Sequence, residues 1–171
     1  MSEALLTFVK GGVHPPDSKI LSKHLAIETM PLPEEVDILL LQHFGVPCKP
    51  IVSKKSKVSE GDVIGETQGL GTSIHASVTG IVRSLDFTPS ATIVSTPSIT
   101  IQTDPGARAR DYAPSDWKGL SARELLEKVR NAGIVGIGGA GFPTHVKLSP
   151  PPEARLDTLI INGAEIGRAH V

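Results

Sequence analysis

The sequence is poor in cysteine and in aromatic residues, and its charges are balanced. Of 171 residues, one is cysteine (Cys48), 4% are aromatic, and 17 Lys and Arg face 18 Asp and Glu. A single cysteine excludes an internal disulfide, and also an iron–sulfur cluster held by this segment alone, because such clusters need several thiolates. The chain has no excess of basic residues to bind phosphates and few aromatic side chains to stack on bases. We therefore expect no nucleic-acid partner.

Long hydrophobic runs are also missing. No apolar stretch approaches the roughly 20 residues that cross a bilayer, and the run at residues 36–41 is interrupted by Asp37 and followed by Gln42. The first ten residues lack the basic start, apolar stretch and cleavage site of a signal peptide. We therefore expect a cytoplasmic location.

Residues 36–103 contain short bursts of apolar, mostly β-branched residues that are separated by glycine and proline. Many short strands with frequent turns are typical of an all-β unit. Residues 60–65 indicate a turn that enters a strand, and residues 74–82 alternate around a turn of small residues. We predict a β domain over residues 1–105.

The pattern then changes. Residues 106–120 mix proline, glycine and charges without a period, which is typical of a linker. Ser121 and Glu124 form a capping box, in which each side chain accepts a hydrogen bond from the backbone N–H of the other residue. We predict a helix that begins at Ser121 and stops at Gly133.

The helix is followed by a glycine-rich run that ends at Lys147. It has five glycines in the nine residues 133–141. Because glycine loses much conformational freedom on folding, a fold that keeps so many needs positive φ or close backbone approach. Close approach lets backbone N–H groups reach an anion, and Lys147 can add a positive charge. The predicted anion-binding residues are Gly136, Gly138, Gly139, Gly141 and Lys147.

Two other interpretations of this run are a dinucleotide-binding turn and a structural loop with a solvated lysine. Three of the glycines satisfy G-x-G-x-x-G, but a preceding helix and the following Pro143 do not suit a dinucleotide-binding turn. The structural loop stays open as an alternative.

Residues 156–162 are rich in branched side chains and predict a buried strand that ends at Asn162. Ligands of α/β folds collect at the carboxyl ends of strands. Asn162 and Glu165 are therefore candidates to bind a heterocycle or a ribose. A plain turn at Asn162 and Gly163 fits the spacing equally well.

Several of these segments resemble known families. Residues 60–65 and 74–82 resemble the barrel-sandwich fold of biotinyl and lipoyl carrier domains, but residues 67–73 contain no lysine to carry the swinging arm. Residues 138–144, with Lys147 and residues 161–165, resemble the flavin-binding subunit of respiratory complex I. When residues 11–16 are considered together with these segments, nearly the whole chain resembles the RnfC family, whose members are subunits of the Rnf ion-translocating electron transport complexes.

This resemblance implies an α+β fold, in which a barrel-sandwich-like β domain precedes the start of an α/β flavin-binding domain. It implies FMN and [4Fe-4S] clusters as cofactors, and electron exchange with NAD(H) and ferredoxin-type carriers. Its partners would be other Rnf subunits, at the cytoplasmic face of the bacterial plasma membrane, where this subunit would be peripheral.

The resemblance also implies roles for the site residues. The glycine loop and Lys147 would hold the flavin phosphate, while Asn162 and Glu165 would contact the flavin or its ribityl chain. Two departures remove polar contacts: Ile137 replaces an arginine of the complex I pattern, and Ala164 replaces an aspartate. It implies no catalytic side chain and no metal ligand in this segment, because the cluster cysteines would lie outside it.

The last six residues, 166–171, are those encoded by ATCGGAAGAGCACACGTC, a string within a common short-read sequencing adapter. We expect them to be an artefact, so that residues 121–165 are a truncated start of the flavin-binding domain. These 171 residues would then fold mainly in the β portion and bind no FMN, and the fragment by itself would be inactive.

Three functions remain open: an electron-transfer subunit, a non-catalytic scaffold that docks on membrane partners through its β domain, and a carrier domain. The missing lysine argues against the third. His14 and His75 have no second ligand at metal spacing, so we predict structural roles for both.

Overall fold

The structure is a computed structural model that describes residues 19–21, 23–90, 95–137, 140–158 and 160. The chain forms two units: Pro31–Arg155, and Met1–Met30 together with Leu156–Val171. In the described part of the second unit the one regular element is a short 3-10 helix, η1 (Lys19–Leu21). All the strands and α-helices assigned to the described residues belong to Pro31–Arg155.

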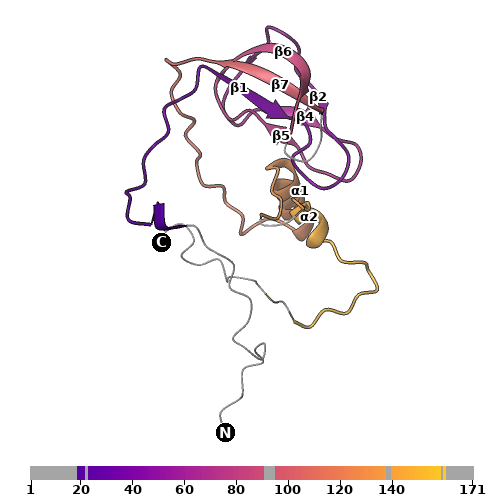
Figure 1. Ribbon diagram of the computed structural model, residues 1–171. Coiled ribbons are helices and arrows are strands. Elements are labelled where there is room, and N and C mark those ends of the chain that lie inside the picture. The colour runs from indigo at the N-terminus through magenta and orange to yellow at the C-terminus, as the bar shows by residue number, and fades with distance from the viewer. Residues whose placement is uncertain (1–18, 22, 91–94, 138–139, 159, 161–171) are drawn as a thin grey trace, which may run out of the picture. The chain divides into compact units, whose positions relative to one another are not determined.

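The first part of this larger unit is an antiparallel β domain of two sheets (Figure 1). Its strands are β1 (Glu35–Leu39), β2 (Lys49–Pro50), β3 (Lys57–Val58), β4 (Val63–Glu66), β5 (Ile74–His75), β6 (Gly80–Thr88) and β7 (Thr96–Thr103). One sheet has the order β1-β7-β6-β3 and the other has the order β2-β4-β5. The predicted apolar bursts thus form strands, while the burst at residues 93–94 lies outside the described residues.

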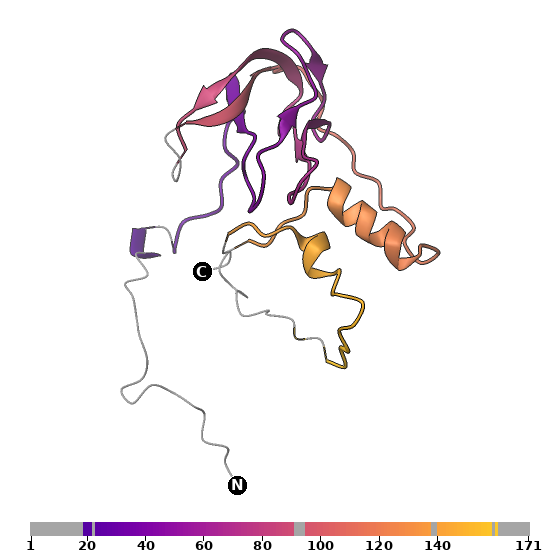
Figure 2. The same cartoon turned by 90° about the vertical axis from the view of Figure 1, so that its right-hand side faces the viewer.

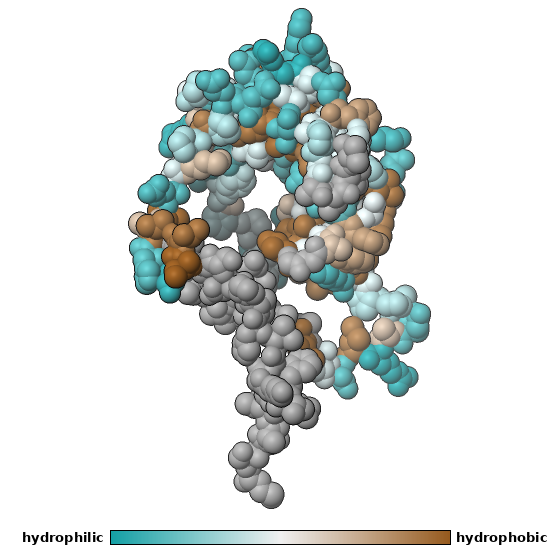
Figure 3. Space-filling model, in the orientation of Figure 1, coloured by the Kyte–Doolittle hydropathy of each residue, from teal (hydrophilic) through white to brown (hydrophobic). Residues whose placement is uncertain are grey.

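The β6–β7 hairpin is the longest pairing, and β1 extends the sheet from the other side of β7. Ile99 of β7 is fully buried between Ile38 of β1 and Leu85 of β6. A bulge between Val82 and Ser84 shifts the register of β6 and allows the sheet to bend. Hydrophilic side chains gather over the upper part of the β domain in the space-filling view (Figure 3).

The hydrophobic core lies between the two sheets. Its buried members are Ile38, Leu40, Cys48, Val58, Ile64, Ile74, Ala76, Val78, Val82, Ile99 and Ile101. Nearly all are aliphatic or small, which lets the sheets pack closely. A compact β domain therefore forms from short strands, as the sequence predicts.

Two α-helices follow the β domain. α1 (Ala122–Asn131) begins with the predicted capping box: the Ser121 N–H donates to the Glu124 carboxylate over 2.7 Å, and the Glu124 N–H donates to Ser121 Oγ over 3.4 Å. The Ser121 hydroxyl also donates to the Glu124 carboxylate over 2.6 Å, and this bond, followed by the one from the Ser121 N–H, lowers the pKa of Glu124. Gly133 ends the helix with φ +71°, as predicted. One more turn, α2 (Thr144–Lys147), was not predicted.

The segment between β7 and α1 has no helix or strand and runs over the β domain. The Arg110 guanidinium donates to the Glu60 carbonyl over 3.0 Å and pairs with Asp62 over 3.3 Å. The expected linker is thus an extended connection that is held to the turn before β4. Among the described residues, no helix is both long and apolar enough to cross a membrane.

The predicted strand at residues 156–162 is wrong for the part of it that the structure describes. No strand is assigned there, and the Leu156 and Ile160 side chains are 71% and 87% exposed. Branched residues favour a strand only where a neighbouring strand pairs with their backbone. No described residue supplies such a neighbour.

Cys48 is a core residue whose thiol donates to the Thr72 carbonyl over 3.2 Å. Burial, and then the charge of Glu66, raise the pKa of this thiol above its ordinary value. The unfolded chain therefore ionises Cys48 at lower pH than the folded chain, and stability is lost as pH rises through that window.

We predict that the free energy of unfolding falls more steeply between about pH 7 and about pH 9.5, on either side of the ordinary thiol pKa, in this chain than in Cys48→Ala. Urea denaturation at both pH values measures this. Equal pH dependence in the two proteins would show that Cys48 ionises equally in both states.

Candidate functional site

The glycine-rich run forms a closed loop at residues 134–144, called the glycine loop below. Two backbone hydrogen bonds close its base: Gly136 N–H donates to the Phe142 carbonyl over 2.9 Å, and Thr144 N–H donates to the Ile134 carbonyl over 3.0 Å. Val135 and Pro143 face each other between them as an isolated bridge. The glycine loop thus joins α1 to α2, and it follows a helix where a dinucleotide-binding turn follows a strand.

Lys147 folds back onto this loop. It is the last residue of α2, and a Cβ added at Gly136 would overlap its Nζ. Glycine at 136 is therefore what lets the ammonium approach the loop backbone. The structure brings together these two predicted site residues, which are eleven positions apart in the sequence.

Gly141 is tied to the β domain. It has φ +64°, and a Cβ added there would lie 3.1 Å from the Gln42 carbonyl oxygen and 3.2 Å from the His43 Cα. Its own carbonyl accepts a hydrogen bond of 3.1 Å from the Phe44 N–H. Backbone packing is thus enough to explain this glycine, which fits the alternative of a structural loop at this position.

The other predicted site residues cannot be placed in the same way. Gly138, Gly139, Asn162 and Glu165 lie outside the described residues. Their roles remain predictions.

Aromatic side chains add to the contact between the glycine loop and the β domain. The Phe44 and Phe142 rings stack with centroids 5.7 Å apart and planes inclined by 25°. Such offset pairs contribute roughly 0.5–1.5 kcal/mol beyond the burial of their area. Phe44 thus holds the loop through both its ring and its backbone N–H.

The C-terminal end of α1 also docks on the β domain. Thr72 Oγ1 donates to the Arg130 carbonyl over 2.6 Å, and the His75 Nε2 donates to the Asn131 carbonyl over 2.9 Å. A helix leaves the carbonyls of its last turn without regular partners, so these side chains act as caps. Figures 1 and 2 show α1 and α2 side by side at this end of the β domain. His75 has the structural role predicted for it.

His43 stabilises the segment that receives the glycine loop, and the sequence alone did not point to it. Its ring is buried, with 7% of the residue exposed. Thr72 N–H donates to Nε2 over 3.4 Å, so the proton of the neutral ring lies on Nδ1, which donates to the Phe44 carbonyl over 3.3 Å. His43 thereby fixes Phe44 and links it to the segment that caps α1.

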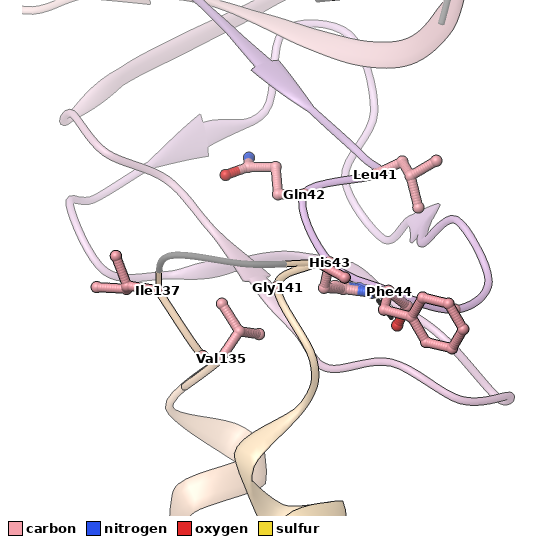
Figure 4. A pocket seen from close by; sticks show the side chains of 10 residues that line it. Leu41, Gln42, His43, Phe44, Val135, Ile137 and Gly141 are labelled. Carbon is pink, nitrogen blue, oxygen red and sulfur yellow. Dashed lines mark hydrogen bonds between the residues drawn. The ribbon is translucent and has the colours of Figure 1, made fainter. Parts of the chain in front are cut away.

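An open cleft of about 730 Å³ lies between the glycine loop and the segment after β1 (Figure 4). Its lining residues are Leu41, Gln42, His43, Phe44, Gly45, Val135, Gly136, Ile137, Ala140 and Gly141. Lys147 contacts the loop but does not line this cleft. Apolar side chains suit a planar ring, while glycine backbone suits an anion.

The described residues hold no group of three or more His, Cys, Asp and Glu side chains arranged to bind a metal ion. His145 lies on α2, and burial, followed by the charge of Arg130, lowers its pKa. A neutral imidazole at this point adds no positive charge to the loop at neutral pH.

We predict that Gly141→Ala destabilises the chain by more than about 1 kcal/mol, because alanine is strained at positive φ. Hydrogen exchange at the Phe44 amide should become faster, because the methyl group pushes the Gly141 carbonyl away. Gly119→Ala is the matched control: nothing lies within 4 Å of the added Cβ, and the expected change is within about 0.5 kcal/mol. Unchanged exchange at Phe44 in Gly141→Ala would contradict this docking.

Comparison with known families matches both halves of the chain. A family model described as the RnfC barrel sandwich hybrid domain matches residues 7–106. A second, described as the Nuo51 FMN-binding domain, matches residues 129–167. The predicted α+β fold, a barrel-sandwich β domain followed by the start of a flavin-binding domain, is confirmed by these matches.

Comparison with individual curated proteins points to the same family as the family models. The chain is 40% identical to the C subunit of the proton-translocating ferredoxin:NAD(+) oxidoreductase complex of Clostridium ljungdahlii, over 94% of this chain and 36% of the relative. It is 39% identical to the Na(+)-translocating counterpart of Acetobacterium woodii, over 91% and 36%. It is 38% identical to the C subunit of the ion-translocating oxidoreductase complex of Rhodobacter capsulatus, over 92% and 31%. The chain thus spans about a third of the length of these relatives, and it belongs to the RnfC family.

Proposed function

We propose that this chain is part of a subunit of a membrane-bound complex that couples electron transfer between NAD(H) and ferredoxin-type carriers to ion translocation. Support comes from its membership of the RnfC family and from the names of its relatives, which are subunits of ferredoxin:NAD(+) oxidoreductase complexes. The subunit would be peripheral, at the cytoplasmic face of the bacterial plasma membrane, beside the other Rnf subunits.

Within that subunit, the glycine loop and Lys147 hold the phosphate of FMN. The observation that carries this proposal is the contact of the Lys147 ammonium with the loop at Gly136, where a Cβ would fill the space. A lysine ammonium is a compact charge that suits a phosphate dianion, and the absence of a side chain at Gly136 lets this ammonium lie against the loop. The residues present thus fit the phosphate end of a flavin nucleotide.

FMN, when bound, supplies the step between hydride transfer from NADH and single-electron transfer to clusters. The protein residues bind and orient it. Phe44 and Val135 offer apolar surface in the cleft, and Ile137, 91% exposed, adds no charge where the complex I pattern has an arginine. Lys147 therefore supplies the positive charge at this loop. Asn162 and Glu165 are the proposed contacts to the ring or the ribityl chain.

The [4Fe-4S] clusters take their ligands from elsewhere in the longer protein. Cys48, the one cysteine of this chain, is buried in the β core, and burial raises the pKa of its thiol. A thiol must ionise to bind iron, so Cys48 is unsuited to the task.

We predict that, in the longer protein that contains this chain, Lys147→Ala raises the Kd for FMN by about ten- to a hundredfold, the loss of one charge-assisted hydrogen bond. Lys128→Ala, which removes an exposed lysine of α1, is the matched control and should leave the Kd unchanged. Fluorescence titration of FMN measures both.

Equal effects of the two substitutions would contradict the role of Lys147. A longer protein that binds no FMN would instead favour the non-catalytic scaffold function.

A further inference from the structure

The cleft beside the glycine loop has a second wall, and this wall belongs to the β domain. Residues 41–45, which follow β1, line it opposite Val135, Gly136, Ile137, Ala140 and Gly141. Figure 4 shows both segments and the side chains that they contribute. A ligand held by the glycine loop therefore meets β-domain residues as well.

Gln42 carries the side-chain amide of this wall. Its Nε2 donates to the Leu39 carbonyl over 2.9 Å. Because a carbonyl oxygen can only accept, the amide nitrogen must be the atom that faces Leu39, and this fixes the amide orientation. Oε1 is left as an acceptor, with no donor bonded to it in the part of the chain that the structure describes.

The direction of this amide suits a ligand in the cleft. In Figure 4 the Gln42 side chain extends toward the side on which Ile137 lies. A ligand between the two walls would thus meet an acceptor from the β domain.

The backbone of Gln42 is held firmly against the glycine loop. Its carbonyl oxygen packs against Gly141, and two residues later the Phe44 N–H donates to the Gly141 carbonyl. The stack of Phe44 on Phe142 adds to the same contact. A side chain on a segment held in this way loses little further entropy when it binds a ligand.

We propose that Gln42 is a flavin-binding residue supplied by the β domain. Its Oε1 accepts a hydrogen bond from a neutral donor of the flavin nucleotide, either the imide N–H of the ring or a ribityl hydroxyl. An amide oxygen cannot donate to phosphate oxygens, so the phosphate end falls to the glycine loop and Lys147. This inference rests on the proposed FMN function and adds the β domain to its binding site.

The test uses the longer protein that contains this chain and measures the Kd of FMN by fluorescence titration. Gln42→Ala should raise the Kd by about five- to tenfold, the loss of one neutral hydrogen bond. Gln68→Ala is the matched control, because Gln68 is an exposed glutamine of the β domain that does not line this cleft. Inorganic phosphate should compete with FMN equally well in all three proteins.

Flavin analogues identify the donor without any substitution in the protein. An FMN methylated at the imide nitrogen, and one that lacks the ribityl hydroxyls, each remove one class of donor. One of them should bind the wild-type protein about five- to tenfold more weakly than FMN, and this penalty should disappear in Gln42→Ala because the partner is already missing.

The outcomes separate this inference from the function on which it rests. If the wild-type protein binds FMN but Gln42→Ala binds it as tightly as Gln68→Ala does, the role of Gln42 is overturned while the FMN site stands. If the wild-type protein binds both analogues as tightly as it binds FMN, the role of Gln42 is overturned as well. This outcome can be measured even if Gln42→Ala fails to fold. If the wild-type protein binds no FMN, both proposals are wrong.

Discussion

The hydrogen bond from the Phe44 N–H to the Gly141 carbonyl is the contact on which the candidate site depends. It joins a β-domain segment to a loop that is almost a hundred residues further along the chain. Around it lie the stacked rings of Phe44 and Phe142 and the Thr72 and His75 caps on α1. Together they attach the start of the flavin-binding domain to the β domain at two points.

This attachment gives the glycines different tasks. Gly141 permits close packing on the β domain, while Gly136 admits the Lys147 ammonium to the loop. Each added methyl group would meet a different neighbour, so the docking on the β domain and the proposed anion binding rest on different glycines. The cleft forms between the two docked segments, and a cofactor held there would also stabilise their contact, because binding to the folded state favours it.

Local patterns in the sequence predicted local structure well. The capping box at Ser121 and the stop at Gly133 need only neighbouring residues, and alternating apolar residues were enough for the β strands. The strand expected at residues 156–162 failed in its described part, because a strand needs a partner that the segment itself cannot supply. Gln42, His43 and the capping role of His75 were missed, since each depends on residues distant in sequence. The glycine loop was recognised from its composition, but the docking of Gly141 was not.

Nuclear Overhauser effects between the Phe44 and Phe142 rings measure whether the glycine loop rests on the β domain through Phe44. The four phenylalanines of the chain can be assigned one by one by substitution. With ring centroids 5.7 Å apart, cross-peaks between the ring protons of Phe44 and Phe142 should be strong, and they should weaken in Gly141→Ala. Sharp, assigned resonances for both rings without any cross-peak between them would show that the loop does not rest on Phe44.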